Sequence, residues 1–163
     1  MKKIAKRILC LCLVAAVSGS GFQGIGLKSP VVHAESAKDS EGRTIKTVSN
    51  ASELESAFQS TAYAAGAKLR IRLTSDIEWG YYCWGGTMEK DVDVVLDLNG
   101  HTLTMSDCLY MNAYGRNMKL TVENGKIIVN NNFNALRVRG TEAYFAELKV
   151  SGVTILNTRD DEM

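Results

Sequence analysis

Residues 96–104 read LDLNGHTLT, and residues 120–127 read LTVENGKI. In both stretches an Asn-Gly pair separates two short runs in which apolar and polar residues alternate. Such alternation is typical of half-buried strands, and Asn-Gly is a strong turn signal. Residues 148–156 (LKVSGVTIL) follow the same plan with Ser-Gly at the turn. The fold is therefore decided by three strand-turn-strand units.

The spacing of these units distinguishes between two β architectures. The turn glycines are Gly100, Gly125 and Gly152. A meander of β-hairpins would place turn signals every ~8–12 residues. The turn recurs here with a period of roughly 25, which is typical of the coils of a solenoid. We therefore predict stacked coils over about residues 69–157, with a sandwich or barrel of hairpins as the alternative.

An earlier segment fits the same template. Residues 69–77 lie one period before the first unit and lack the Asn-Gly pair, with Ile71 expected beneath Leu96 and Leu73 beneath Leu98. The inward aliphatic side chains of one coil are buried only by neighbouring coils, and each is worth ~1.5–3 kcal/mol. Further predicted contacts place Leu96, Leu98 and Leu103 on Leu120, Val122 and Ile127, and these on Val150 and Ile155.

One amphipathic helix is predicted before the strands, at about residues 53–65. Ser52 and Glu55 have the spacing of a capping box, and Leu54 and Phe58 fall on one helical face. The end of a stack of coils exposes apolar surface and an open sheet edge. We expect the helix to cap the first coil.

The order of this helix and of the segments IRLTSDI (71–77), LDLNGHTLT and LTVENGKI resembles the N-terminal coils of the pectate-lyase-like right-handed parallel β-helix superfamily. The resemblance covers about residues 47–157. It implies an all-β fold, a short right-handed parallel β-helix with an N-terminal capping helix. It implies little about activity, because these coils recur in lyases, glycosidases and adhesins. It also implies a stacked asparagine position held by Asn99 and Asn124, with Ser151 departing from it.

Residues 1–34 have the features of a secretory signal peptide. Four basic residues precede an apolar run of about ten residues, and small residues lead to an expected cleavage after Ala34. Earlier cleavage near Ser18 is an alternative. The apolar run is too short for a bilayer of ~30 Å, so a retained membrane anchor is the less favoured interpretation. We expect a secreted, extracellular protein that is also a candidate for association with the cell surface.

The remaining chain is predicted to comprise a flexible segment, residues 35–46, and one β-helix domain, residues 47–163. Positions 1–34 hold five of the 19 lysines and arginines and none of the 18 acidic residues. The rest therefore carries 14 basic and 18 acidic side chains, a net charge of −4. Nucleic-acid binding usually requires a basic surface, so the charge argues against a nucleic-acid partner.

The cysteines suggest one disulfide. Cys10 and Cys12 lie in the signal segment, which leaves Cys83 and Cys108 about one coil apart. The oxidising environment of secreted proteins favours a disulfide between these two cysteines. A disulfide that closes a loop of this length stabilises the folded state by ~3–4 kcal/mol. The alternative is two buried free thiols.

An aromatic cluster and two arginines suggest a weak polysaccharide site. Flat rings on a loop can stack against sugars, and alternation in residues 135–139 points two arginines outward. The alternative is that the rings cover the side of the stack. The predicted ligand-binding residues are Trp79, Tyr81, Tyr82, Trp84, Arg137 and Arg139.

Catalytic chemistry is not indicated by any motif. His101 has Ser106, Asp97 and Asp107 nearby, so a catalytic triad can be drawn from the sequence. No Gly-x-Ser-x-Gly elbow accompanies these residues, and a polar residue after a turn glycine is ordinary. Lyases of the resembling superfamily use a basic residue, typically arginine, and no arginine here comes with a family motif. We assign no catalytic residue.

Calcium is the usual cofactor of the resembling lyases and requires converging carboxylates. Glu89, Asp91 and Asp93 alternate, and Asp76 and Asp97 are expected one coil away from one another. A solvated acidic face explains the same pattern more simply. We assign no metal ligand and no cofactor, with calcium kept as a weak alternative.

Three functions remain open from the sequence. The favoured one is a non-catalytic secreted or surface protein that binds polysaccharide or another surface partner. The others are a carbohydrate-active enzyme of lyase or glycosidase type, and an N-terminal fragment of such an enzyme. The last coil has no apparent cap, so self-association there is an additional expectation.

Overall fold

The computed structural model describes residues 37–63, 66–80, 82–85, 91–130 and 134–158, all within one compact unit, Glu35–Met163. In chain order its elements are β1 Thr44–Val48, α1 Ala51–Tyr63, β2 Lys68–Leu73, β3 Ile77–Trp79, β4 Tyr82–Gly85, β5 Val92–Asp97, β6 Thr102–Met105, β7 Leu109–Asn112, β8 Met118–Val129, β9 Leu136–Arg139 and β10 Ala146–Asn157.

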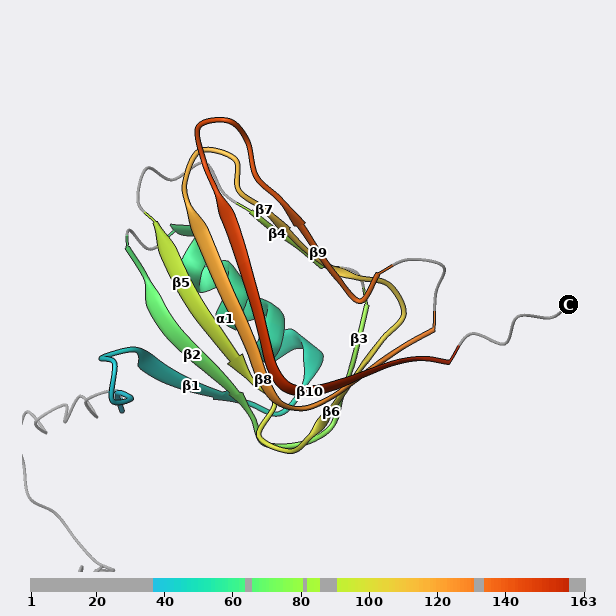
Figure 1. Cartoon of the computed structure of the whole chain (residues 1–163). Helices are drawn as coiled ribbons and strands as arrows, with labels where there is room; N and C mark the ends of the chain where they lie inside the picture. Colours follow the sequence, from blue (N-terminus) through green and yellow to red (C-terminus); the bar gives the residue numbers. More distant parts are fainter. Residues whose placement is uncertain (1–36, 64–65, 81, 86–90, 131–133, 159–163) are drawn as a thin grey trace, which may run out of the picture. The chain divides into compact units, whose positions relative to one another are not determined.

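These strands form a parallel β-solenoid of about four turns (Figure 1). The larger sheet has the order β1-β2-β5-β8-β6-β3, with β10 also paired to β8, and the smaller sheet has the order β4-β7-β9. The long strand β8 bends, so that its first half pairs with β5 and its second half with β6. Hairpin neighbours would be antiparallel, whereas the strand pairs here are parallel. The solenoid prediction is confirmed.

Inward-facing side chains at matching positions of successive coils form a column, and one such column shows how the coils stack. Ile71 lies opposite Leu96, Leu96 opposite Val122, and Val122 opposite Val150. The expected positions of Ile71 beneath Leu96 and of Val122 against Val150 are confirmed. Leu96, rather than Leu98, faces Val122, so this part of the expected order is shifted by two positions.

The turn between β5 and β6 explains the shift. Asp97 is in register with Glu123, and Thr102 is in register with Lys126. Four residues therefore lie between Asp97 and Thr102 at the first turn. Only two residues lie between Glu123 and Lys126 at the turn of the next coil. The Asn-Gly turn of residues 99–100 is wider than that of residues 124–125, although the two have the same letters.

The structure changes one member of the implied asparagine position, the residue on the last coil, which is Gly152 and not Ser151. Asn99, Asn124 and Gly152 have positive φ of 51°, 60° and 63°, and the flanking register places Asn124 opposite Gly152 rather than the serine before it. Gly125 has a different role. A Cβ at Gly125 would lie 2.5 Å from Leu98 Cβ, so glycine allows two coils to approach here.

The helix begins two positions earlier than predicted. Asn50 Oδ1 accepts from the Glu53 amide at 3.0 Å, and the Glu53 carboxylate accepts from the Ser49 amide at 2.7 Å. Asn50 is therefore the N-cap, and the predicted box at Ser52 is wrong. The helix packs as expected, because Leu54 and Phe58 are fully buried.

The segment before the helix is not simply flexible. Strand β1 pairs in parallel with β2, with Val48 opposite Leu73. Arg43 is 8% exposed, and its Nη2 donates to Asp93 Oδ2 at 3.2 Å. Residues 44–46 of the segment expected to be flexible therefore belong to a strand of the larger sheet. Polar outward side chains concealed the strand, since only Val48 of β1 is buried.

Candidate functional site

The two tryptophans of the predicted glycan site are buried. Trp79 is 4% exposed and Trp84 is 1% exposed, and their rings pack against Phe58 with centroid distances of 5.7 Å and 5.4 Å. Their indole groups donate to the helix, Trp79 to Glu55 at 3.2 Å and Trp84 to Thr61 at 2.8 Å. These rings hold α1 against the coils and are not accessible for stacking on a sugar.

The other predicted ligand residues do not gather at one place. Tyr81 lies outside the described residues, and the half-buried Tyr82 ring lies 5.2 Å from the Trp79 ring. Arg137 and Arg139 are exposed on β9, in the smaller sheet. The Arg137 guanidinium lies 5.0 Å from the centroid of the Tyr110 ring. The structure therefore separates an internal aromatic cluster from two surface arginines.

Cys83 and Cys108 are both free thiols, the first exposed and the second buried. Cys83 is in register with Tyr110 and not with Cys108, because the coil is longer here than at the Asn-Gly turns. Cys108 is thus displaced by two positions along the neighbouring strand, which puts the two Cα atoms ~8 Å apart, beyond the reach of a disulfide. The predicted bridge is wrong. Burial raises the pKa of the Cys108 thiol.

His101 does not face the residues of the triad that can be drawn from the sequence. Its Nδ1 lies 3.4 Å from Asp76 Oδ1, and that oxygen also accepts from the Thr102 amide at 2.9 Å. Asp97 instead accepts from Arg72 Nε at 3.0 Å. The contacts of His101 therefore link two turns of the solenoid.

The acidic residues considered for calcium have other partners. Asp91 accepts from the amide and Nδ2 of Asn117, both at 3.1 Å, and Asp93 binds Arg43. Glu89 lies outside the described residues. Within the described part of the chain, no three His, Cys, Asp or Glu residues converge as a metal site would require.

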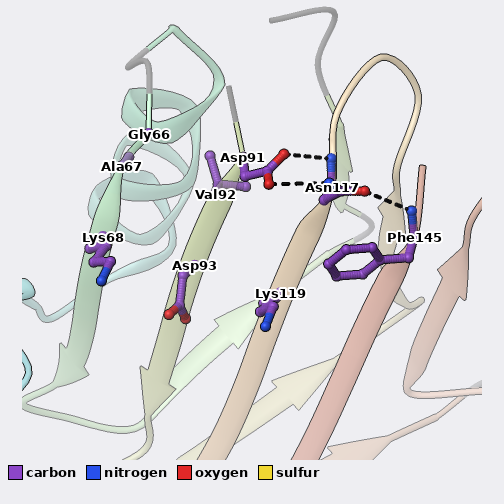
Figure 2. Close-up of a pocket in the computed structure, with 9 residues that line it drawn as sticks. All are labelled: Gly66, Ala67, Lys68, Asp91, Val92, Asp93, Asn117, Lys119 and Phe145. Atoms are coloured by element: carbon purple, nitrogen blue, oxygen red, sulfur yellow. Dashed lines mark hydrogen bonds between the residues drawn. The ribbon is translucent and has the colours of Figure 1, made fainter. Parts of the chain in front are cut away.

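An open groove of about 620 Å³ lies at the start of β2, β5 and β8. Figure 2 shows side chains from successive parallel strands along it, with Lys68, Asp93 and Lys119 in a row. The residues that line the groove are Gly66, Ala67, Lys68, Asp91, Val92, Asp93, Asn117, Lys119 and Phe145.

A short hydrogen-bond ladder orders one side of the groove (Figure 2). Asn117 donates twice to Asp91, and Asn117 Oδ1 accepts from the Phe145 amide at 3.0 Å. The Phe145 side chain remains 48% exposed, with Lys119 Nζ 5.7 Å from its ring centroid. The ladder uses the main chain of Phe145, so it positions this residue while leaving the ring open to solvent.

The other side of the groove carries a row of alternating charge, which continues beyond the groove to Glu147. Lys68, Asp93, Lys119 and Glu147 lie opposite one another on four strands. Asp93 binds Arg43 at 3.2 Å, and Lys119 binds Glu147 at 3.2 Å. Lys68 is exposed and forms no ion pair with another described residue. Among the described residues of this row, the ammonium group of Lys68 is therefore the one that can bind an anionic ligand without breaking an existing ion pair.

Arg70 and Arg72, which alternation places outside the core, belong to a network centred on Asp97. Asp97 is 3% exposed and accepts from Arg70 at 3.3 Å and from Arg72 at 3.0 Å. Arg70 also binds Asp39 at 3.0 Å, and Glu123. Burial alone would raise the pKa of Asp97, but hydrogen bonds from Arg72 and from Asn124 and Asn99 lower it overall. This network joins coils and engages both guanidinium groups, although the Arg72 side chain remains 40% exposed.

Sequence reasoning missed the groove because its residues are far apart along the chain. Lys68, Asp93 and Lys119 each belong to a different coil, so only the coil register brings them together. The charge alternation across coils was a usable signal. Reading it requires the local coil lengths, which the turn motifs do not supply.

Comparison with known protein families, with curated proteins and with solved structures finds no match. No helix among the described residues has the length and apolar character needed to cross a membrane.

Proposed function

We propose that this chain is a secreted, non-catalytic β-helix protein of the pectate-lyase-like kind that binds an acidic polysaccharide in the groove. One observation carries the proposal: the same open groove presents the half-exposed ring of Phe145 and the exposed ammonium of Lys68. A ring offers an apolar surface to a sugar face, and an ammonium forms a charge-assisted hydrogen bond with a carboxylate.

Further polar groups of the groove suit the hydroxyl groups of a sugar chain. Asp91, Asn117 and Lys119 offer acceptors and donors beside the ring, and the ladder from Asp91 to Phe145 fixes several of them in advance. A prearranged set loses less conformational entropy on binding. The groove crosses strands of successive coils, so an extended polymer is a better match than a compact metabolite.

Arg137 and Arg139 are expected to contribute a weaker, second contact with the polysaccharide. They present two exposed cations on the smaller sheet, and Asn112 is in register with Arg139. We expect them to add a weak, salt-sensitive contact for long polyanionic chains, because exposed charges are readily screened.

The test is affinity electrophoresis on polygalacturonate, with a neutral glucan as reference. Phe145→Ala is expected to weaken retention about tenfold. The matched control is Tyr144→Ala, which removes a neighbouring ring that is 37% exposed and does not line the groove. Equal retention of Phe145→Ala and the unaltered protein would contradict the groove assignment.

A second variant separates charge from ring contact. Lys68→Gln is expected to reduce binding to polygalacturonate at low salt and to leave binding to neutral glucan unchanged. Lys38→Gln, at another exposed lysine, is the control. Release of unsaturated sugar ends during these measurements would show lyase activity and overturn the non-catalytic part of the proposal.

A further inference from the structure

The last coil presents an apolar end. Val150 and Ile155 are each 45% exposed, whereas Val122 and Ile127, opposite them on β8, are fully buried. Strand β10 pairs with β8, and the described residues place no strand on its other edge. An edge with aliphatic side chains and free backbone groups is a surface for strand pairing.

The direction of the backbone groups limits how a partner strand can pair. The Phe145 carbonyl accepts from the Met118 amide at 3.0 Å and so points toward β8. In a parallel ladder such residues alternate with residues whose amide and carbonyl point away. Ala146, Leu148 and Val150 therefore present their backbone groups on the outer edge of β10.

The outward side chains of the same segment are Glu147 and Lys149. A second copy paired antiparallel about Glu147 would place two glutamates opposite each other, and pairing about Lys149 would oppose two lysines. Pairing about Leu148 places each Glu147 opposite a Lys149 of the other copy. It also aligns the outer backbone groups of residues 146, 148 and 150 with their counterparts.

We propose that residues 146–150 of β10 pair antiparallel with the same segment of a second copy, about a two-fold axis at Leu148. The shared sheet brings Leu148 against Leu148 and Val150 against Ala146 on the inner side, so the exposed aliphatic column becomes part of a joint core. The contact is isologous, because the same surface serves both copies. It does not depend on polysaccharide binding.

The opposite end of the solenoid, at β1, disfavours an assembly larger than a dimer. The Ile45 amide donates to the Ala37 carbonyl at 2.8 Å, and Lys38 forms an antiparallel bridge with Thr44. These contacts occupy the outer edge of β1 at its first two residues, Thr44 and Ile45. A copy cannot add its β10 to that edge without displacing them, so head-to-tail filaments are disfavoured.

Sedimentation equilibrium of the purified protein over a wide concentration range tests the proposal. The expected result is a reversible monomer–dimer equilibrium. Lys149→Glu places a glutamate opposite each Glu147 of the other copy and should weaken the dimer on the order of tenfold, because like charges directly opposite one another on paired strands are destabilising. The exchange E147K/K149E should restore most of the lost affinity.

A matched pair of apolar variants provides a second measurement. Val150→Asp places a charge in the joint core and should abolish the dimer, while Leu156→Asp, at a 41% exposed position in the second half of β10, should not. Far-ultraviolet circular dichroism identifies any variant that fails to fold. A protein that stays monomeric at every concentration would overturn the proposal, as would equal dimer affinity of the folded Lys149→Glu protein.

Discussion

The two ends of the solenoid are built from the same kind of coil and differ in what covers them. Ile71 and Val150 belong to one inward column, yet Ile71 is fully buried and Val150 is 45% exposed. At the first end, Ile71 lies one strand inside the stack, because β1 pairs with β2 and places Lys46 opposite it, and Leu54 and Phe58 of α1 are buried in the same core. At the last end, the described residues provide no equivalent cap.

This difference shows that an aliphatic residue in a solenoid gains its stabilising effect from its neighbours. Stability in such folds is approximately a sum of contacts between adjacent coils, so position in the stack matters more than residue type. The charges follow the same rule. Asp97 is buried within the network of the early coils, whereas the side chain of Glu147 on the last coil is 33% exposed.

The capped end provides the largest expected effect. Phe58→Ala removes the ring between Trp79 and Trp84 and should lower the free energy of unfolding by ~3–5 kcal/mol. Phe145→Ala, at a phenylalanine that is 48% exposed, should cost less than ~1 kcal/mol. Urea unfolding monitored by circular dichroism measures both. Similar losses in the two variants would show that α1 is not the stabilising cap.

A valine pair tests the same comparison within one column. Val122→Ala creates a cavity at a fully buried position and should cost ~2–3 kcal/mol. Val150→Ala, at the next coil, should cost less than ~1 kcal/mol in dilute protein. If the cost at Val150 rises with protein concentration, the proposed dimer buries that side chain. Equal costs in dilute protein would contradict the open end.

Charge provides the smallest expected effect. Asp97→Asn should cost ~1.5–2 kcal/mol at neutral pH, because it removes charge-assisted hydrogen bonds from Arg70 and Arg72. Glu147→Gln should cost less than ~0.5 kcal/mol, since exposed pairs contribute little. Urea unfolding at neutral pH compares the two variants with the unaltered protein.

The contribution of Asp97 to the free energy of unfolding should decrease as the pH falls. The folded state lowers the pKa of Asp97, so its contribution is present above the ordinary carboxyl pKa of 3.8 and is lost as the pH falls through the lowered value. Burial would raise the pKa of Asp39, but hydrogen bonds from the Arg43 amide and the Arg70 side chain lower it to about 2, so Asp39 acts in the same direction. We expect a shallower loss of stability between pH ~5 and ~2 in Asp97→Asn than in the unaltered protein. Parallel pH profiles would contradict this assignment.

Much of the coil interior could be predicted, because it depends on local pattern. The alternation around Ile71 and Leu96 indicates which side chains face inward, and the coil period places one above the other. The helix is also local, since the face formed by Leu54 and Phe58 is visible in the sequence. Its exact start was missed because Asn50 competes with Ser52 as the cap.

The candidate site was less predictable, because it depends on differences between coils. The aromatic residues near Trp84 have the composition of a sugar-binding loop, and only the packing of Phe58 shows that they face inward. The groove forms only because Lys68, at the start of β2, and Phe145, just before β10, line the same surface of the folded chain. No local motif contains that information.

The sequence by itself determined a parallel stack of coils and a helix, because alternation, turn residues and a period near 25 act locally and repeat. The tertiary structure decided the register at each turn. The longer coil at Cys83 and the wide turn before Thr102 shift neighbours by two positions. Since side-chain contacts between coils depend on those shifts, tertiary structure alone decided which thiols stay apart, which charges pair and which aliphatic residues remain open.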